Sequence, residues 1–498
     1  MKTKSMRAGL AWAVLGLAGC ATGPDFQPPA APVHNDLGAV ADGTRTVEAR
    51  GSGGASQQFI AELDIPARWW ALFRSETLDA RVREALTNSP SLAQSMARLR
   101  KAREEYHAQA GTARFPSVDA GLAASRQKVN PAAMGIPDVP VPAPFNLFNA
   151  SVNVAYTFDL FGKNRRALEA LQAQVDRQEY ELEAARQTLA ANVVLTSLRL
   201  AEAEQRLATA REIAEARAAQ MEIAIRREAA GGISARELEA QGLVLEQARA
   251  ALPAAEDQVA RLRRQLAVYL GREPGDTADD MLDLNALHLP EEVPASLPAA
   301  IARQRPDIRA AEAVWHQACA NVGVATADLY PQITLTGSLG AQQADLTDIL
   351  EKANVWSIGA GLMQPVFHGG ALRARKRAAV AAYDEAAAAY RETVLRGLQE
   401  AADVLGALEA DARILAARTA AANHARTAVE IAARQEAQGG LSRAVLLEDE
   451  VRHLQAEGER IAAQAARHAD TAALFHALGG GWWNRDSSGR QAGRDCPD

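Results

Sequence analysis

Apolar residues recur at helical spacing over long stretches of the chain. The clearest run follows intervals of three and four residues through Leu189, Val193, Thr196, Leu200, Ala203, Leu207 and Ala210. The same intervals return from Leu245 to Tyr269 and from Leu447 to Phe475. Seams that mix small and large residues in this way indicate long helices packed as antiparallel coiled coils. Residues 165–229 contain no proline or glycine, so we expect a helix of about 98 Å there, and one of about 100 Å over 371–437.

Two adjacent glycines interrupt each helical run at a constant interval. The pairs are Gly231 with Gly232 before Ser234, and Gly439 with Gly440 before Ser442, 208 residues later (439 − 231 = 208). An interior glycine costs a helix roughly 1 kcal/mol relative to alanine, whereas glycine ends helices and serine begins them readily. We therefore expect a helical hairpin tip at each pair.

Four segments change to strict alternation of apolar and polar residues, which predicts strands. They are residues 116–125, 150–160, 332–341 and 356–367. About ten alternating residues is also the length that crosses an outer membrane when tilted, although a half-buried sheet in a soluble protein gives the same pattern. Four strands cannot close a barrel, for which roughly eight are needed, and open edges are not tolerated in lipid. Membrane-spanning strands would thus require a barrel shared by two chains or by three, between which the pattern does not decide.

The helices and strands follow one plan twice. Each half has a shorter helix that ends at an aromatic–proline pair, Phe115-Pro116 or Tyr330-Pro331, and then a strand pair, a long helix and a return helix. We divide the chain into an N-terminal targeting segment (1–19), a segment that leads into the helices (20–90), a first repeat (91–297), a second repeat (298–478) and a tail (479–498).

The N-terminus has the composition of a targeting segment. Lys2, Lys4 and Arg7 precede an apolar run that ends in "LAGC" at Cys20. Basic residues followed by a short apolar stretch indicate a secretory signal, and the cysteine makes the segment similar to a bacterial lipobox, which implies cleavage before Cys20 and lipidation of its thiol. An ordinary signal with a chance cysteine is the alternative. Ala21 implies transfer to the outer membrane, and we expect Cys319 and Cys496 to be free thiols.

Composition and charge narrow the classes of function. The net charge of −7 gives no basic face for nucleic acid. Past the N-terminus no apolar run is long enough for a membrane helix. The sequence has neither Cys-x-x-Cys nor His-Glu-x-x-His, the spacings that hold zinc. We therefore expect no enzymatic activity, no catalytic residues, no metal and no cofactor other than the lipid on Cys20.

Several motifs resemble the outer-membrane factor family of TolC-like channels, and within it the NodT-type efflux lipoproteins. They are "GPDFQPPAAPV", "YTFDLFGKNRRALEA", "RQRPDIRAAEAVWHQACANVGVATADLYPQITLTGSLG" and "LMQPVFHGGALRA". The resemblance implies a mainly α-helical chain with a membrane β-barrel. It implies a homotrimer, whose four strands per chain close one twelve-stranded barrel, and a periplasmic α-barrel of coiled coils. The family's tip motif falls on Gly231 and Ser234, and on Gly439 and Ser442.

We expect a passive outer-membrane channel of a tripartite efflux system. Its partners would be a periplasmic adaptor protein, an inner-membrane pump of the RND type and outer-membrane lipid. The exit duct of a type I protein secretion system and a soluble coiled-coil scaffold are the alternatives. The tips would contact the adaptor and form the closed end of the duct. The candidate gate residues at the tips are Arg226, Arg227, Glu228, Arg236, Arg443, Glu448 and Asp449.

Overall fold

The structure is a computed structural model of the 498-residue chain. It describes residues 22–30, 42–61, 63–128, 130, 140–141, 143–276, 281–295, 298–345 and 355–485. The signal peptide, Cys20 and Cys496 lie outside the described residues, so the predictions made for them stay predictions.

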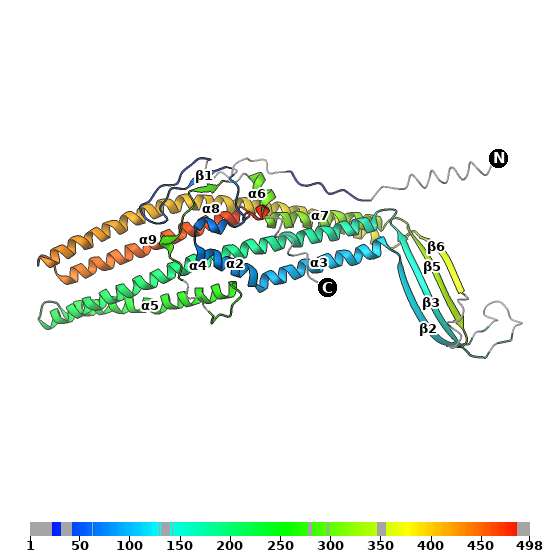
Figure 1. Ribbon diagram of the computed structural model, residues 1–498, viewed down its shortest axis with the longest axis horizontal. Helices are drawn as coiled ribbons and strands as arrows, with labels where there is room; N and C mark the ends of the chain where they lie inside the picture. Colours follow the sequence, from blue (N-terminus) through cyan, green and yellow to red (C-terminus); the bar gives the residue numbers. More distant parts are fainter. Residues whose placement is uncertain are drawn as a thin grey trace. The chain divides into compact units, whose positions relative to one another are not determined.

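The chain divides into two compact units. A strand unit contains residues up to Pro28, Arg98–Gln178 and Ala311–Tyr390, and a hairpin unit contains Pro29–Ala97, Glu179–Ala310 and the residues from Arg391 onward. The hairpin unit is mainly helical, whereas the strand unit combines helical segments with a four-stranded sheet (Figure 1). Among the helices of the described residues, none is both long enough and apolar enough to cross a membrane.

Long helices make up most of the described chain. The elements in the order of the sequence are η1 (Trp69–Phe73), α2 (Glu76–Asn88), α3 (Pro90–Arg114), α4 (Lys163–Ala229), α5 (Ala235–Tyr269), η3 (Leu284–Ala286), α6 (Pro298–Gln304), α7 (Pro306–Ala327), α8 (Ala371–Ala437), α9 (Arg443–Ala477) and η5 (Trp482–Asn484). Helices α4 and α8 each contain 67 residues, and α5 and α9 each contain 35.

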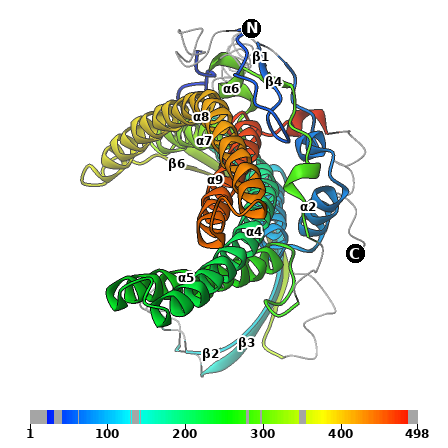
Figure 2. The ribbon, with the colours of Figure 1, turned by 90° about the vertical axis from the view of Figure 1, so that its left-hand side faces the viewer.

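The hairpin unit contains two antiparallel helix pairs. In the first, Arg211 of α4 bonds Glu256 of α5, and Glu204 bonds Arg263. Seven residues backward along α4 (211 − 204 = 7) therefore match seven residues forward along α5 (263 − 256 = 7), which is the register of an antiparallel coiled coil. In the second, Arg418 of α8 bonds Glu459 of α9. Both pairs are visible in two orthogonal views (Figures 1 and 2).

The predicted helical seams are buried. Along α4, Leu189, Val193 and Leu200 are almost inaccessible to solvent. In α9, Val451 and Phe475 are equally covered. The prediction of packed antiparallel helices is confirmed, because alternating intervals of three and four residues place these side chains on one stripe of each helix.

Four strands of the strand unit form one antiparallel sheet in the order β2-β3-β5-β6. The strands are β2 (Ser117–Gln127), β3 (Phe145–Phe158), β5 (Gln332–Gln343) and β6 (Val355–Met363). The sheet begins and ends close to the predicted positions, with two differences. Strand β3 starts earlier and stops before Asp159, whose carboxylate instead accepts the backbone N–H groups of Asn164 and Arg165 in the first turn of α4. Strand β6 stops before Pro365, because proline cannot donate to a β-ladder.

A small parallel sheet lies within the hairpin unit. Strand β1 (Gln58–Ile60) pairs with β4 (Glu292–Pro294). The side chain of Arg467 on α9 is fully buried and donates hydrogen bonds to the carbonyls of Gly53 and Ala55 and to the hydroxyl of Thr46. These bonds give partners to both terminal nitrogens of the buried guanidinium, although not to its Nε, and they fix residues 46–55 against α9.

Candidate functional site

The four-stranded sheet has one apolar face and one polar face. Residues directly opposite each other on paired strands point to the same side of a sheet, so the observed register defines the two faces. One row reads Ala120, Val152, Leu339 and Trp356 across the four strands. The apolar face also carries Val118, Leu122, Ala150, Val154, Tyr156, Phe158, Ile333, Leu335, Ala341, Ile358, Ala360 and Leu362.

The opposite face is lined by hydroxyl, amide and glycine positions. Its polar and glycine members include Ser117, Asp119, Gly121, Asn149, Ser151, Asn153, Thr157, Thr334, Thr336, Ser338, Gln342 and Ser357, whereas Phe145, Leu147, Val355 and Met363 lie on the same face near the strand ends. The hydroxyls of Ser338 and Ser357 lie 2.9 Å apart, and those of Thr157 and Thr334 lie 3.1 Å apart. Cross-strand hydrogen bonds of this kind stabilise the pairing and keep a wettable surface.

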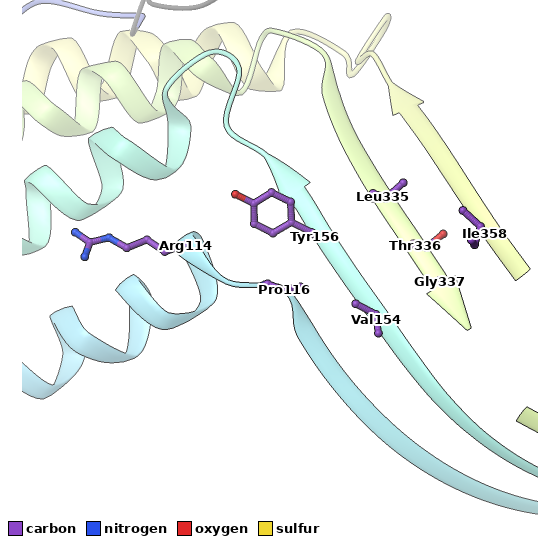
Figure 3. Close-up of a pocket in the computed structure, with 8 residues that line it drawn as sticks. All are labelled: Arg114, Pro116, Val154, Tyr156, Leu335, Thr336, Gly337 and Ile358. Carbon is purple, nitrogen blue, oxygen red and sulfur yellow. The ribbon is translucent and has the colours of Figure 1, made fainter. Parts of the chain in front are cut away.

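The apolar face is strongly exposed in the single chain. Trp356 exposes 72% of its surface, Ile358 78% and Leu122 71%. A hollow of about 460 Å³ lies on this face, lined by Tyr156, Leu335 and Ile358 and by Arg114 at the end of α3 (Figure 3). An exposed apolar surface of this extent indicates a region that contacts lipid or another chain.

Each hairpin tip is built around a glycine in the left-handed region. Gly231 has φ of +72° and Gly439 has +76°. At the first tip the N–H of Gly232 donates to the carbonyl of Arg227 at 2.7 Å, and at the second the N–H of Gly440 donates to Gln435 at 2.8 Å. This bonding closes the end of a helix and requires a positive φ at its glycine. The predicted helix break at both glycine pairs is confirmed.

The serines that begin the return helices differ in what they do. The Ser234 hydroxyl accepts the N–H of Glu237, whose carboxylate accepts the N–H of Ser234, which forms a reciprocal capping box. Ser442 occupies the same backbone position, but its side chain makes no cap hydrogen bond. Both serines therefore begin their return helices as predicted, but only Ser234 adds a side-chain bond. Val445 stands where the first hairpin has Glu237 (445 − 208 = 237), so no carboxylate fixes this serine.

The candidate gate residues separate into two groups. Glu448 and Asp449 come together with Arg452, and Arg443 pairs with Glu450 at 3.6 Å, all on the second hairpin. Arg226, Arg227 and Arg236 lie exposed on the first hairpin, where Arg227 and Arg236 help to lower the pKa of Glu237 after the larger contributions of its bonds to Ser234. The Glu228 carbonyl accepts the N–H of Gly231.

A polar contact between the two hairpins was missed by the sequence analysis. Arg217 of α4 forms an ion pair with Glu448 of α9, and Gln220 donates to the same carboxylate and to the carbonyl of Ala444. Burial raises the pKa of Glu448, but the bonds from Arg217 and Gln220 outweigh it and hold that pKa below its usual value. The signal was present in the sequence: Arg217 and Gln220 continue the spacing of Ile213 and interrupt an otherwise apolar seam.

That contact stands beside an apolar cluster. Leu447 and Val451 of α9 are buried with Ala216 of α4, and Ile213 and Ile223 pack against them. The second hairpin is therefore attached to α4 near its tip by both packing and charge.

A carboxyl pair lies farther along the second hairpin. Burial, and then a hydrogen bond and charge repulsion from Asp470 on α9, raise the pKa of Asp411 on α8 to about 7, while Arg467 opposes the shift. Two carboxyl groups in such proximity favour one shared proton. Cys319 of α7 is a buried free thiol, as predicted.

Comparisons with known proteins agree with this geometry. The model of the family described as outer membrane efflux protein matches residues 82–272 and 297–480. The chain is 30% identical to the outer membrane protein OprJ of Pseudomonas aeruginosa over 94% of both proteins. It is 27% identical to the pyoverdine export outer membrane protein OpmQ of the same species, over 83% of this chain and 87% of that protein.

A solved structure shares the fold over almost the whole chain. The outer-membrane channel OprN superposes with a TM-score of 0.79 at 28% identity, covering 93% of this chain and all of that one. The family model alone accounts for most of the chain, including both hairpins and all four long strands. The chain therefore belongs to the outer membrane efflux protein family.

Proposed function

We propose that this chain forms the outer-membrane channel of a tripartite efflux system and passively conducts small toxic compounds to the cell exterior. The two-faced sheet is the observation that carries the proposal. Its exposed apolar face suits the hydrocarbon of a bilayer, and its polar face suits a water-filled lumen. Diffusion through such a lumen requires no catalytic residue, metal or cofactor, and we assign none.

We propose a homotrimer with one shared barrel of twelve strands. Strands β2 and β6 are the two edges of the sheet, and an unpaired edge is not stable in lipid. Pairing β6 of one chain with β2 of the next removes every edge once the ring closes. Four strands from each of three chains make the twelve.

The uneven burial of the return helices supports assembly of several copies. Leu243 of α5 is 61% exposed, whereas Val451, at the same place in the second hairpin (451 − 208 = 243), is fully buried. We propose that a second copy of the chain covers α5 and that the helices together form a periplasmic α-barrel. The equal helix lengths and the 208-residue interval support two internal repeats.

The hairpin tips are the proposed contact with a periplasmic adaptor protein, through which an inner-membrane pump of the RND type delivers cargo. In the resting channel the tips converge and close the duct. The ion pairs around Glu448 and Asp449 favour the closed state, and adaptor binding opens the tips by favouring the open one. A lipid on Cys20 anchors the assembly in the outer membrane.

The experiment measures the growth of a deletion strain on dyes, detergents, antibiotics and metal salts. The strain is compared with the same strain carrying a complementing copy of the gene. We expect selective sensitisation, higher accumulation of a fluorescent dye, and restoration by the gene. A strain that resists every compound as the parent does, yet lacks a protein in its medium, would overturn efflux and favour protein secretion.

Neighbouring positions on the two sheet faces provide a matched control. Ser338→Cys places a thiol on the polar face, and Leu339→Cys places one on the apolar face. In the complemented strain a water-soluble, membrane-impermeant maleimide should label the first variant and leave the second unlabelled. Equal labelling of both variants would contradict a lipid-facing apolar side.

A further inference from the structure

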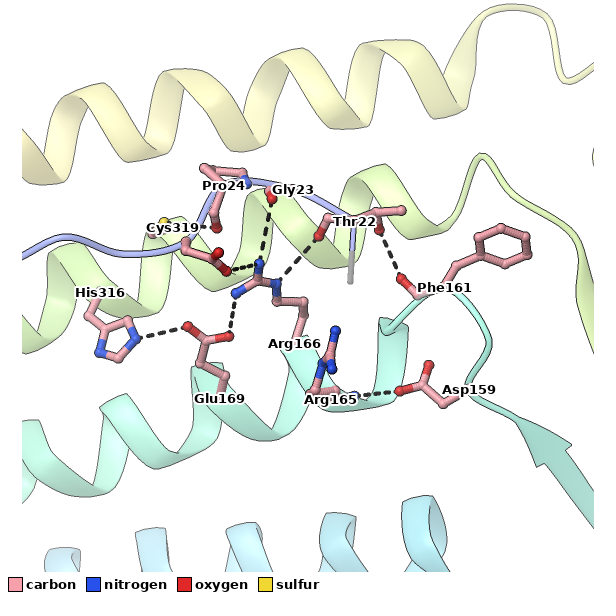
Figure 4. A network of polar contacts seen from close by, with 11 residues as sticks. Thr22, Gly23, Pro24, Asp159, Phe161, Arg165, Arg166, Glu169, His316 and Cys319 are labelled. Atoms are coloured by element: carbon pink, nitrogen blue, oxygen red, sulfur yellow. Dashed lines mark hydrogen bonds and ion pairs between the residues drawn. The ribbon is translucent and has the colours of Figure 1, made fainter. Parts of the chain in front are cut away.

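The segment Thr22–Phe26 is held against helices α4 and α7 by a dense set of contacts (Figure 4). Both the N–H and the hydroxyl of Thr22 donate to the carbonyl of Phe161, at 3.1 and 3.0 Å. Phe161 lies in the turn between β3 and α4, and its ring stacks on Tyr330 next to the start of β5. The segment is thus attached where the strands of the sheet meet the helices.

Arg166 is the centre of this attachment. Its side chain is only 5% exposed, and it donates to the carbonyl of Thr22 at 3.4 Å and to the carboxylate of Asp25 at 2.6 Å. A further bond of 2.7 Å to Glu169 satisfies another of its donors, and Glu169 also contacts His316 of α7 at 2.9 Å. A buried guanidinium with several partners fixes geometry well, because its donors form a rigid planar fork.

Gly23 and Phe26 pack closely against helix α7. A Cβ added to Gly23, whose φ is +96°, would lie 2.5 Å from the Cα of Gly323 on α7, so the two backbones cross in contact. The Phe26 ring stacks on His316 at 4.5 Å and meets Trp315 edge-on at 5.5 Å. These contacts give a physical reason for the motif "GPDF", residues 23–26, which the channel function leaves unexplained.

We propose that this clamp is a positioning site for the lipid-modified N-terminus, with Arg166 as its positioning residue. One residue, Ala21, lies between Cys20 and Thr22, and an extended chain spans at most about 7 Å over these two residue steps. The clamp therefore confines the acyl chains to the strand–helix junction, where they enter the bilayer beside the sheet. The inference rests on the lipidation and membrane insertion proposed above.

This role differs from plain stabilisation of α4 and α7. A clamp that acts by positioning a lipid matters only when the lipid is present, whereas a clamp that merely stabilises the helices matters equally without it. A double-mutant cycle separates the two, because independent effects multiply and coupled effects do not.

The experiment compares Arg166→Gln in two full-length backgrounds. One keeps the native signal, and the other carries an ordinary cleavable signal, so that the mature chain begins at Ala21 without a lipid. The readout is the rate at which heat-stable oligomer appears in outer-membrane fractions. In the lipidated background we expect a loss of about tenfold, the factor that corresponds to one charge-assisted network. In the other background we expect no further loss. Arg165→Gln, an exposed neighbour, should change neither.

Equal fold losses in both backgrounds would overturn the proposal and leave the clamp a purely structural contact. If Arg166→Gln yields no folded chain, Asp25→Ala decides, since it removes the carboxylate that accepts from Arg166 and keeps the bond between Arg166 and Glu169. Mass spectrometry of the N-terminal peptide reports the lipid directly. An unmodified Cys20 would also overturn the clamp proposal, whereas dye efflux, measured in parallel, tests the channel function separately.

Discussion

The two helical hairpins share one backbone turn and differ in the contacts that their return helices make. Both tips close on a glycine with positive φ, at the same 208-residue interval. The first tip is finished by its own capping box, and its return helix α5 is largely exposed. The second lacks the side-chain cap, and its return helix α9 is buried against α4. The turn is therefore set by glycine, whereas the environment of each return helix is set by its partners.

The difference continues along the coiled coils. The polar group Asp411, Arg467 and Asp470 of the second hairpin falls, after subtraction of 208, on Ala203, Val259 and Leu262 of the first. All three of these apolar residues are buried. One backbone plan thus accommodates an apolar layer in one hairpin and a charged layer in the other. The charged layer contains Asp411, whose pKa is raised to about 7 by burial and by Asp470.

The largest expected effect comes from Val451 of α9, the buried counterpart of the exposed Leu243 of α5. Val451→Ala removes two methyl groups from a fully buried site beside Leu447, so we expect a loss of about 2 kcal/mol in unfolding free energy. Thermal unfolding followed by circular dichroism measures it. Leu243→Ala should leave the unfolding of dissociated chains nearly unchanged and weaken the oligomer. A comparable loss for both variants in dissociated chains would remove the distinction between α5 and α9.

The next largest effect is expected from the ion pair between Arg217 and Glu448, which joins the two hairpins. Glu448→Gln removes the charge that pairs with Arg217, whose side chain is 14% exposed, and we expect a cost of about 1–2 kcal/mol for the partly buried pair. The tips should then open more often, which growth in a large antibiotic that the outer membrane normally excludes would report as sensitivity. Arg226→Gln on the first tip is the matched control, and equal sensitivity of the two strains would argue against a specific role of Glu448.

Ser234 and Ser442, which begin α5 and α9, should differ less in their effect on stability. Ser234→Ala removes the bond to the Glu237 N–H and should cost about 1 kcal/mol, whereas Ser442→Ala removes no cap bond and should be nearly neutral. Hydrogen exchange of the amides in the first turns of α5 and α9 resolves each tip separately. Faster exchange at α9 in Ser442→Ala than at α5 in Ser234→Ala would reverse the comparison.

We expect the smallest effect on the free energy of unfolding from the charged layer of Asp411, Arg467 and Asp470. This effect depends on pH. The pKa of Asp411 is raised to about 7, well above its unfolded value, so folding favours the protonated form. The contribution of Asp411 to the free energy of unfolding is fully present below pH 4. It is lost as pH rises toward 7, because the unfolded chain then releases a proton that the folded chain retains. Asp411→Asn should therefore stabilise the chain at pH 8 by about 1 kcal/mol after screening, and leave it nearly unchanged at pH 4. Thermal unfolding at both pH values checks this, with Ala203→Asn as the control in the apolar layer.

The sequence was sufficient for the elements that depend on local chemistry. Alternation located the four strands of the sheet, and the glycine pairs located both tips, because period and φ preference are properties of short segments. Contacts between distant segments could not be read in this way. Arg217 and Glu448 are 231 residues apart, and Arg166 contacts Asp25 across 141. Such pairs are determined by which segments pack together in the fold, which no short pattern specifies.

The most direct test of the account is whether three chains close one ring through the sheet edges. Cysteines placed at Ala120 of β2 and, in turn, at Trp356, Ile358 and Ala360 of β6 would be oxidised in membranes, with Cys319 and Cys496 replaced by alanine. Within one chain the two edges are three strand spacings apart, about 14 Å, which is too far for a disulfide. The account predicts, for at least one pair, a covalent ladder that ends at three chains. A ladder that continues past three, or no link between chains at any pair, would contradict it.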